Sequence, residues 1–141
     1  GYVPQDGALF TTMRINRQLA YALTIRRWPR AEIDTRIGEL AQLLHIEPLL
    51  ERMPDRLSGG EAHRVAIGRD IACRPAVLLL DEPLVGLDDE TRRRLVDLLK
   101  AVQQSTGATI LHVTHSLEDM DALAERLWRI EDGRVQEIDR R

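Results

Sequence analysis

Hydrophobic residues recur at helical spacing along the first half of the chain. Between residues 15 and 25 the apolar positions have a roughly helical period, and Pro29 suits the first turn of a second helix. That second helix carries an amphipathic stripe: Ile33, Ile37, Leu40 and Leu44. We therefore expect residues 5–53 to be mainly helical, with a short apolar turn at residues 46–54 and a strand end at the GYVPQD opening.

The pattern changes at Ser58. Ser58 followed by Glu61 fits a capping box, which predicts a helix to about Cys73, and Pro75 then breaks that helix. The next run, AVLLLDE, has no polar alternation, as is typical of a strand buried on both faces. The run ATILHVTH predicts a second buried strand.

Two helices and a hairpin complete the predicted second half. The run DDETRRRLVDLLKAVQQSTG predicts a helix with an acidic start that ends at Gly107. Its inner stripe is Leu95, Leu98, Leu99 and Val102. A short helix begins at Ser116 with Asp119 as capping partner, and Asp132-Gly133 predicts a hairpin turn. Strand–helix–strand alternation favours an α/β fold with a parallel sheet.

Composition narrows the function classes. The 141 residues are 43% hydrophobic and 30% charged, as in ordinary globular domains, and suffice for one domain. A net charge of −3 argues against a nucleic-acid partner. Cys73 is the single cysteine, which excludes an internal disulfide and indicates a reducing compartment. No apolar run approaches the roughly 20 residues of a membrane span.

Asp81 and Glu82 follow the first buried strand, where parallel sheets gather their ligands. One carboxylate can hold Mg²⁺ through its water shell while its neighbour polarises an attacking water, the division that phosphoryl transfer needs. An acidic turn that caps the next helix explains the same two residues. The pair alone leaves both interpretations open.

Gly59 and Gly60 open the helix that begins after Ser58. Free N–H groups at a helix start, backed by the helix dipole, form an anion site that suits phosphate. The capping box accounts for Ser58 and Glu61 without a ligand, but it leaves the two glycines unexplained. The glycines therefore favour a phosphate site.

His115 follows the second buried strand, at the edge where we expect the two carboxylates. Its imidazole could contact a terminal phosphate or the attacking water. Gln5, in a loop after a strand, could contact Mg²⁺ or water. We interpret His45, His63 and His112 as polar surface residues.

Five motifs occur in an order that resembles the ATP-binding subunits of ABC transporters. VPQD resembles the Q-loop, LSGGE the signature, VLLLDEP the Walker B strand, GLD the D-loop and VTHS the switch-histidine motif. The match covers nearly the whole chain. It implies a partial P-loop NTPase-like parallel sheet of ABC ATPase type with an α-helical subdomain, and it implies ATP and Mg²⁺ as ligands.

The resemblance also implies residue roles. Asp81 would lie in the Mg²⁺ shell and Glu82 would be the general base. His115 would contact the γ-phosphate, and Gln5 would contact both Mg²⁺ and the lytic water. These assignments come from the family motifs and their order.

The signature and D-loop imply a partner. Ser58, Gly59, Gly60 and Glu61 would contact the ATP held by a second nucleotide-binding domain in a head-to-tail dimer, and Asp88 would reach across that interface. Glu61 stands where the signature usually has glutamine, a change that keeps the capping role. Val85 and Gly86 depart from the usual D-loop residues, which puts a side-chain contact there in doubt.

The family organisation implies two parts. Residues of about 12–56 and the signature helix from 57 correspond to the α-helical subdomain, and residues 75–141 to the core with the Walker B, D-loop and switch-histidine motifs. A transmembrane permease would dock through the Q-loop and helical subdomain, around residues 5–27. The subunit would then be cytoplasmic and peripheral at the inner face of the membrane.

One family element is missing from the sequence. No G-x-x-x-x-G-K-[ST] loop occurs in the 141 residues, so the Walker A cradle for the phosphates is absent. We expect a C-terminal portion of the domain that cannot bind ATP tightly or hydrolyse it alone. Exposed sheet edges at residues 77–80 or 110–113 would then favour marginal stability or oligomers.

Three functions remain open. GYVPQDGALF and the run HIEPLLERMPDRLSGGEAHRVAIGR most resemble importer ATPases for molybdate and related oxyanions. A second possibility is a non-catalytic truncated product that pairs with intact subunits. A soluble non-transport ABC ATPase is the third. The span from Gln5 to Ser58 has no room for the long coiled coils of chromosome and repair types, and translation types usually carry two domains in tandem.

Overall fold

The computed structural model describes residues 1–138, so the last three residues of the predicted 75–141 core lie outside the described part. The elements in chain order are β1 (Tyr2–Val3), α1 (Ile15–Ile25), α2 (Arg30–Leu44), α3 (Gly59–Ile71), β2 (Val77–Asp81), α4 (Asp89–Thr106), β3 (Thr109–Val113), α5 (Leu117–Leu123), β4 (Leu127–Glu131) and β5 (Arg134–Ile138). Short 3₁₀ turns at Glu47–Leu49 and Pro54–Arg56 join α2 to α3.

The central sheet is parallel. Its order is β1-β2-β3, with Leu79 of β2 paired to Tyr2 on one side and to Leu111 on the other. The chain passes from β1 to β2 through α1, α2 and α3, and from β2 to β3 through α4; such helical crossovers are expected for a parallel sheet. The predicted α/β class with a parallel sheet is confirmed.

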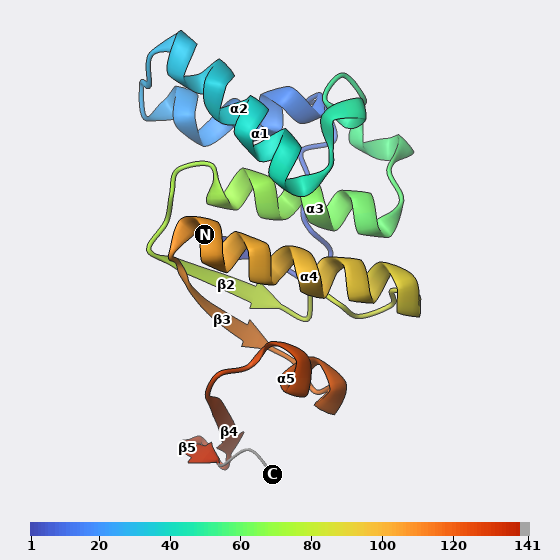
Figure 1. The fold of residues 1–141 in the computed structure, drawn as a ribbon, viewed down its shortest axis with the longest axis vertical. Coiled ribbons are helices and arrows are strands. Elements are labelled where there is room, and N and C mark those ends of the chain that lie inside the picture. The colour runs from blue at the N-terminus through green and yellow to red at the C-terminus, as the bar shows by residue number, and fades with distance from the viewer. Residues whose placement is uncertain (139–141) are drawn as a thin grey trace.

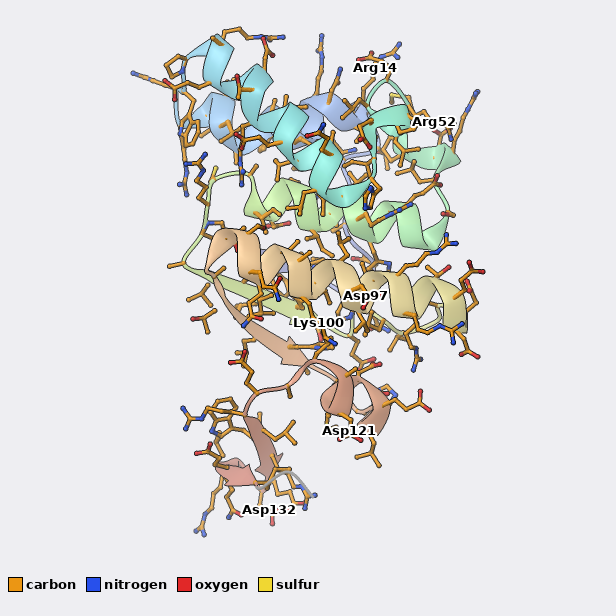
Figure 2. The ribbon with its side chains drawn as sticks, in the orientation of Figure 1. Arg14, Arg52, Asp97, Lys100, Asp121 and Asp132 are labelled. Atoms are coloured by element: carbon orange, nitrogen blue, oxygen red, sulfur yellow. The ribbon has the colours of Figure 1, made fainter. Side chains whose placement is uncertain are left out.

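The hairpin predicted at Asp132-Gly133 is also present. Strands β4 and β5 pair antiparallel, and the two turn residues have φ values of 49° and 72°. Positive φ at both central residues gives the turn a twist that matches the strands. The hairpin turn lies at the opposite end of the molecule from Arg14 and Arg52 in Figure 2.

One hydrophobic core joins the helices to the sheet. Its buried members include Leu19 of α1, Leu40 of α2, Ile67 of α3, Leu99 of α4 and Leu80 of β2. Figure 1 shows the resulting layers, with α1 and α2 above α3 and with α4 next to the strands. Within residues 1–138, none of the helices combines the length and hydropathy that a bilayer crossing requires.

The prediction that both strands are buried on both faces is wrong. Leu78 and Leu80 are buried beneath the helices, whereas Val77, Leu79, Leu111 and Val113 are exposed by 48%, 38%, 48% and 56%. The helices of the described chain cover only one face of the sheet, so alternate residues of each strand face solvent. Of the two predicted edges, β3 is an edge strand and β2 is central.

Candidate functional site

The predicted catalytic residues gather at one edge of the sheet. Because β1, β2 and β3 run parallel, their carboxyl ends lie at the same edge. Gln5 follows β1, Asp81 ends β2 with Glu82 directly after it, and His115 follows β3. The arrowheads of β2 and β3 point toward the side on which α3 and α4 begin (Figure 1).

Glu82 and His115 are in direct contact. His115 Nδ1 lies 2.9 Å from Glu82 Oε1, and the side chains are 75% and 25% exposed, respectively. The Glu82 amide donates to the carbonyl of Val113 at 3.0 Å, which fixes Glu82 to the end of β3. Glu82 also has a φ of 45°, in the left-handed region that side chains rarely adopt. Such strain costs about 1–3 kcal/mol and clusters at functional sites.

Asp81 has a partner that sequence reasoning missed. The hydroxyl of Tyr2 donates to Asp81 Oδ2 at 3.2 Å, and this hydrogen bond raises the pKa of Tyr2. Tyr2 is paired beside Leu79, two residues before Asp81, so its side chain reaches the end of β2. The sequence shows only an aromatic residue three positions before Gln5. The pairing register between β1 and β2 is needed to see that this residue reaches Asp81.

The donor set fits Mg²⁺ held through water rather than an all-protein metal site. Among residues 1–138, no three His, Cys, Asp or Glu side chains converge to hold a metal. Mg²⁺ typically keeps several waters and is bound by one or two carboxylates plus substrate phosphates. Asp81, partly exposed at the strand end, can serve as such a carboxylate.

The signature region shows the predicted capping box. Ser58 Oγ accepts from the Glu61 amide at 3.3 Å, and Glu61 Oε2 accepts from the Ser58 amide at 2.7 Å. This second bond lowers the pKa of Glu61. A Cβ at Gly60 would lie 2.6 Å from Thr91 Cγ2, whereas one at Gly59 would meet Leu87 at 4.0 Å. Close packing against Thr91 of α4 thus explains why residue 60 is a glycine without invoking a phosphate.

Asp88 caps α4 within its own chain. Its carboxylate accepts from the amides of Glu90 and Thr91 and from the Thr91 hydroxyl. The hydrogen bond from the backbone N–H of Thr91 is the main cause of the lowered pKa of Asp88. The D-loop carboxylate is therefore engaged at the helix start, one turn before Arg92.

Side chains from the helices hold the segment after Gln5. His63 Nε2 lies 3.2 Å from the Gln5 carbonyl and His63 Nδ1 lies 2.9 Å from the Gly59 carbonyl. Arg69 donates to the carbonyls of Gly7 and Ala8. The wholly buried Gln18 bonds the backbone of residues 10 and 13. The signature helix α3 is thereby joined to the Q-loop segment.

One of the three histidines, His112, was interpreted wrongly as a surface residue. His63 is partly exposed, and its ring nitrogens lie close to the carbonyls of Gln5 and Gly59. His112 lies beside Leu80 on β3, partly buried, and its Nε2 is buried with no partner among residues 1–138. Burial lowers the pKa of His112. His45 is exposed, as expected, and its φ of 52° ends α2.

Comparison with known proteins identifies the family. The model of the ABC transporter family matches residues 1–85, more than half of the chain. The chain belongs to the ABC transporter family. The resemblance inferred from the five motifs is therefore confirmed.

Several import proteins are similar to this ABC family member. The molybdate/tungstate import ATP-binding protein WtpC of Thermococcus kodakarensis is 44% identical over 97% of this chain and 42% of its own length. WtpC of Archaeoglobus fulgidus is also 44% identical, over 97% of this chain and 56% of its own length. The sulfate/thiosulfate import ATP-binding protein CysA of Xylella fastidiosa strain 9a5c is 39% identical over 98% of this chain and 41% of its length. The chain spans about half the length of the relatives it matches.

Proposed function

We propose that this chain supplies the signature, Walker B, D-loop and switch-histidine parts of an ATPase subunit that powers solute import. The observation that carries the proposal is the contact between Glu82 and His115 at 2.9 Å, beside Asp81. A base, an imidazole and a metal-binding carboxylate at the carboxyl edge of a parallel sheet suit phosphoryl transfer. The names of the import ATP-binding relatives support the same function.

The chemistry divides among three side chains. Glu82 takes a proton from the water that attacks the terminal phosphorus of ATP, which forms ADP and inorganic phosphate. His115 orients the Glu82 carboxylate and donates toward the terminal phosphate. Asp81 would hold Mg²⁺ through water, and the ion would offset phosphate charge. Gln5, which follows β1 at the same edge of the sheet, would contact the ion and the attacking water.

The 141 residues hold no Walker A loop, and we propose that they do not turn over ATP alone. Backbone N–H groups and a lysine of that loop normally cradle the β- and γ-phosphates. The only lysine here is Lys100, within α4 and labelled on that helix in Figure 2.

We propose two protein partners. A second nucleotide-binding domain would place its ATP against Ser58, Gly59, Gly60 and Glu61, with Asp88 near the shared interface. A transmembrane permease would dock on the Q-loop and the helical subdomain of about residues 12–56 with the helix from 57, leaving residues 75–141 as core. The exposed ring pair of Phe10 and Tyr21, with centroids 4.9 Å apart, supports an apolar contact there.

The transported solute is proposed from the relatives. Those named for molybdate, tungstate, sulfate and thiosulfate import favour an oxyanion importer. Binding to a permease would hold the subunit at the inner face of the membrane.

The experiment is ATP turnover by the chain extended at its amino terminus with a family segment that carries G-x-x-x-x-G-K-[ST]. Glu82→Gln should lower the turnover rate by about 100-fold or more, because it removes the general base. Glu47→Gln, an equal charge change in the 3₁₀ turn after α2, is the control and should leave turnover unchanged. Full turnover by Glu82→Gln would refute the assigned role.

A further inference from the structure

Asp119 is a buried carboxylate directly behind the loop that carries His115. It is 2% exposed and lies in the first turn of α5, four residues after His115. A buried carboxylate is strongly destabilising unless cations and hydrogen bonds compensate it. The groups that compensate the Asp119 carboxylate therefore indicate which segments it holds in place.

The first set of partners shapes the His115 loop. Thr114 Oγ1 donates to Asp119 Oδ2 at 3.3 Å and accepts from the Ser116 amide at 3.0 Å. Ser116 Oγ in turn accepts from the Asp119 amide at 3.3 Å. His115 lies between two residues that are both tied to Asp119, so the Asp119 carboxylate fixes the backbone from which its imidazole extends.

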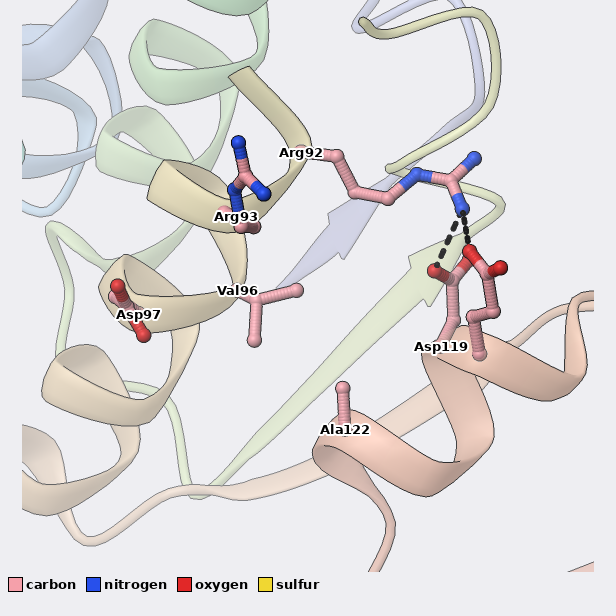
Figure 3. A pocket seen from close by; sticks show the side chains of 7 residues that line it. Arg92, Arg93, Val96, Asp97, Asp119 and Ala122 are labelled. Atoms are coloured by element: carbon pink, nitrogen blue, oxygen red, sulfur yellow. Dashed lines mark hydrogen bonds and ion pairs between the residues drawn. The ribbon is translucent and has the colours of Figure 1, made fainter. Parts of the chain in front are cut away.

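The second partner is Arg92 of α4. Its Nη1 lies 3.5 Å from Asp119 Oδ1 and donates to Glu118 Oε2 at 3.1 Å. Figure 3 shows Arg92 reaching from α4 toward Asp119 on α5, while Arg93 is directed elsewhere. The Arg92 side chain is 27% exposed, and the Asp119 side chain 3%. An ion pair this sheltered is screened far less than a surface pair.

Arg92 is also tied to the D-loop. Its amide donates to the Asp88 carbonyl at 2.8 Å, within the first turn of α4. Two further titratable side chains interact with this network: Glu118, which accepts a hydrogen bond from Arg92, and His112 of β3, which interacts electrostatically with Asp119. Burial lowers the pKa of His112, so the arginine carries the compensating charge at neutral pH.

We propose that Arg92 is a positioning residue for His115: through Asp119 it holds the loop of residues 114–116 against the start of α4. The D-loop and the switch histidine of one chain then keep a fixed relation, because both are attached to the same turn of helix. The importance of His115 rests on the proposed function. The positioning itself is a property of the fold and can be tested without nucleotide.

The test is amide hydrogen exchange of the 141-residue chain, followed by nuclear magnetic resonance. Arg92→Gln should speed exchange of the Ser116 and Asp119 amides about tenfold relative to amides of α3, the effect of losing roughly one hydrogen bond to a charged group. Arg92→Lys keeps the positive charge and should restore most of the protection. Arg93→Gln, the same change one residue along, is the control and should have no effect.

A double variant distinguishes positioning from general stabilisation. If Arg92 acts through Asp119, then Arg92→Gln combined with Asp119→Asn should accelerate exchange no more than Asp119→Asn alone. Unchanged Ser116 exchange in Arg92→Gln, or an equal acceleration in α1 and α3, would overturn the proposal. If Arg92→Gln does not fold, Arg92→Lys must still give a local, smaller acceleration at Ser116. Failure of the extended chain to hydrolyse ATP would refute the proposed function and leave this result standing.

Discussion

Glu82 combines backbone strain with a side-chain contact that only the folded chain provides. Its φ of 45° and its hydrogen bond to the β3 end aim the carboxylate at His115. The sequence predicted that Glu82 and His115 would lie at one sheet edge, because strand ends can be read locally. It could not predict Tyr2 as the partner of Asp81, because that contact depends on the register between β1 and β2.

Gly60 and Gly59 are adjacent, but an added methyl group would meet different surroundings at each. Gly60→Ala should lower the free energy of unfolding by about 1–3 kcal/mol, because the added methyl would overlap Thr91 Cγ2 at 2.6 Å. Gly59→Ala meets only Leu87 at 4.0 Å and should be neutral or stabilising. Urea denaturation measures both. Equal stability of the two variants would contradict the packing role of Gly60.

His112 should make stability depend on pH. Burial lowers the pKa of His112 below its ordinary value of 6.5. Near and below that pH, the imidazole of the unfolded state therefore binds a proton more readily than the imidazole of the folded state. Stability is then complete above pH 6.5 and falls as the pH drops below that value toward the folded-state pKa. His112→Gln should flatten the dependence of the urea midpoint on pH between 7 and about 5, whereas His45→Gln should not. An unchanged slope in His112→Gln would count against a buried neutral imidazole.

At the scale of elements, the caps and apolar stripes were predicted correctly because both are local. The capping box, the Ser116 cap and the inner stripe of α4 each depend on residues within a few positions of one another. Burial of the strands depends on what covers each face, which no local pattern specifies. The joins from His63 and Arg69 to the Q-loop segment span about sixty residues and were missed for the same reason.

Ser58 should matter to the helix that follows it. Ser58→Ala removes the acceptor of the Glu61 amide and should cost about 1 kcal/mol of unfolding free energy, measured by urea denaturation. Glu61→Gln keeps an oxygen that can accept from the Ser58 amide and serves as the control, with a change of only a few tenths of a kcal/mol expected. A Ser58→Ala variant as stable as the parent would show that α3 does not depend on this cap.

At the scale of the whole molecule, the uncovered sheet face is the dominant feature. Leu79 of β2 and its partner Leu111 of the edge strand β3 expose apolar side chains there, as does Val113 at the end of β3. Exposed apolar strands at a sheet edge favour pairing with other chains. Covering this apolar face would therefore lower the free energy of the chain.

We predict that the chain self-associates through this face. Sedimentation velocity across a range of concentrations should show species larger than the 16.1 kDa monomer. Leu111→Lys should shift the distribution toward monomer, because it charges the exposed face. Ile130→Lys, an equal change on the exposed β4 strand, is the control and should not shift it. A sharp monomer at all concentrations with a cooperative melt would contradict the prediction.

We propose that the 141 residues contain half of an ATP site, and calorimetry of MgATP binding to this chain tests the proposal. The chain should give no saturable heat, while the same chain extended with the G-x-x-x-x-G-K-[ST] segment should bind, since the phosphates then gain their cradle. Saturable MgATP binding by the 141 residues alone would refute the proposal. It would mean that Asp81, Gln5 and His115 hold nucleotide without a Walker A loop.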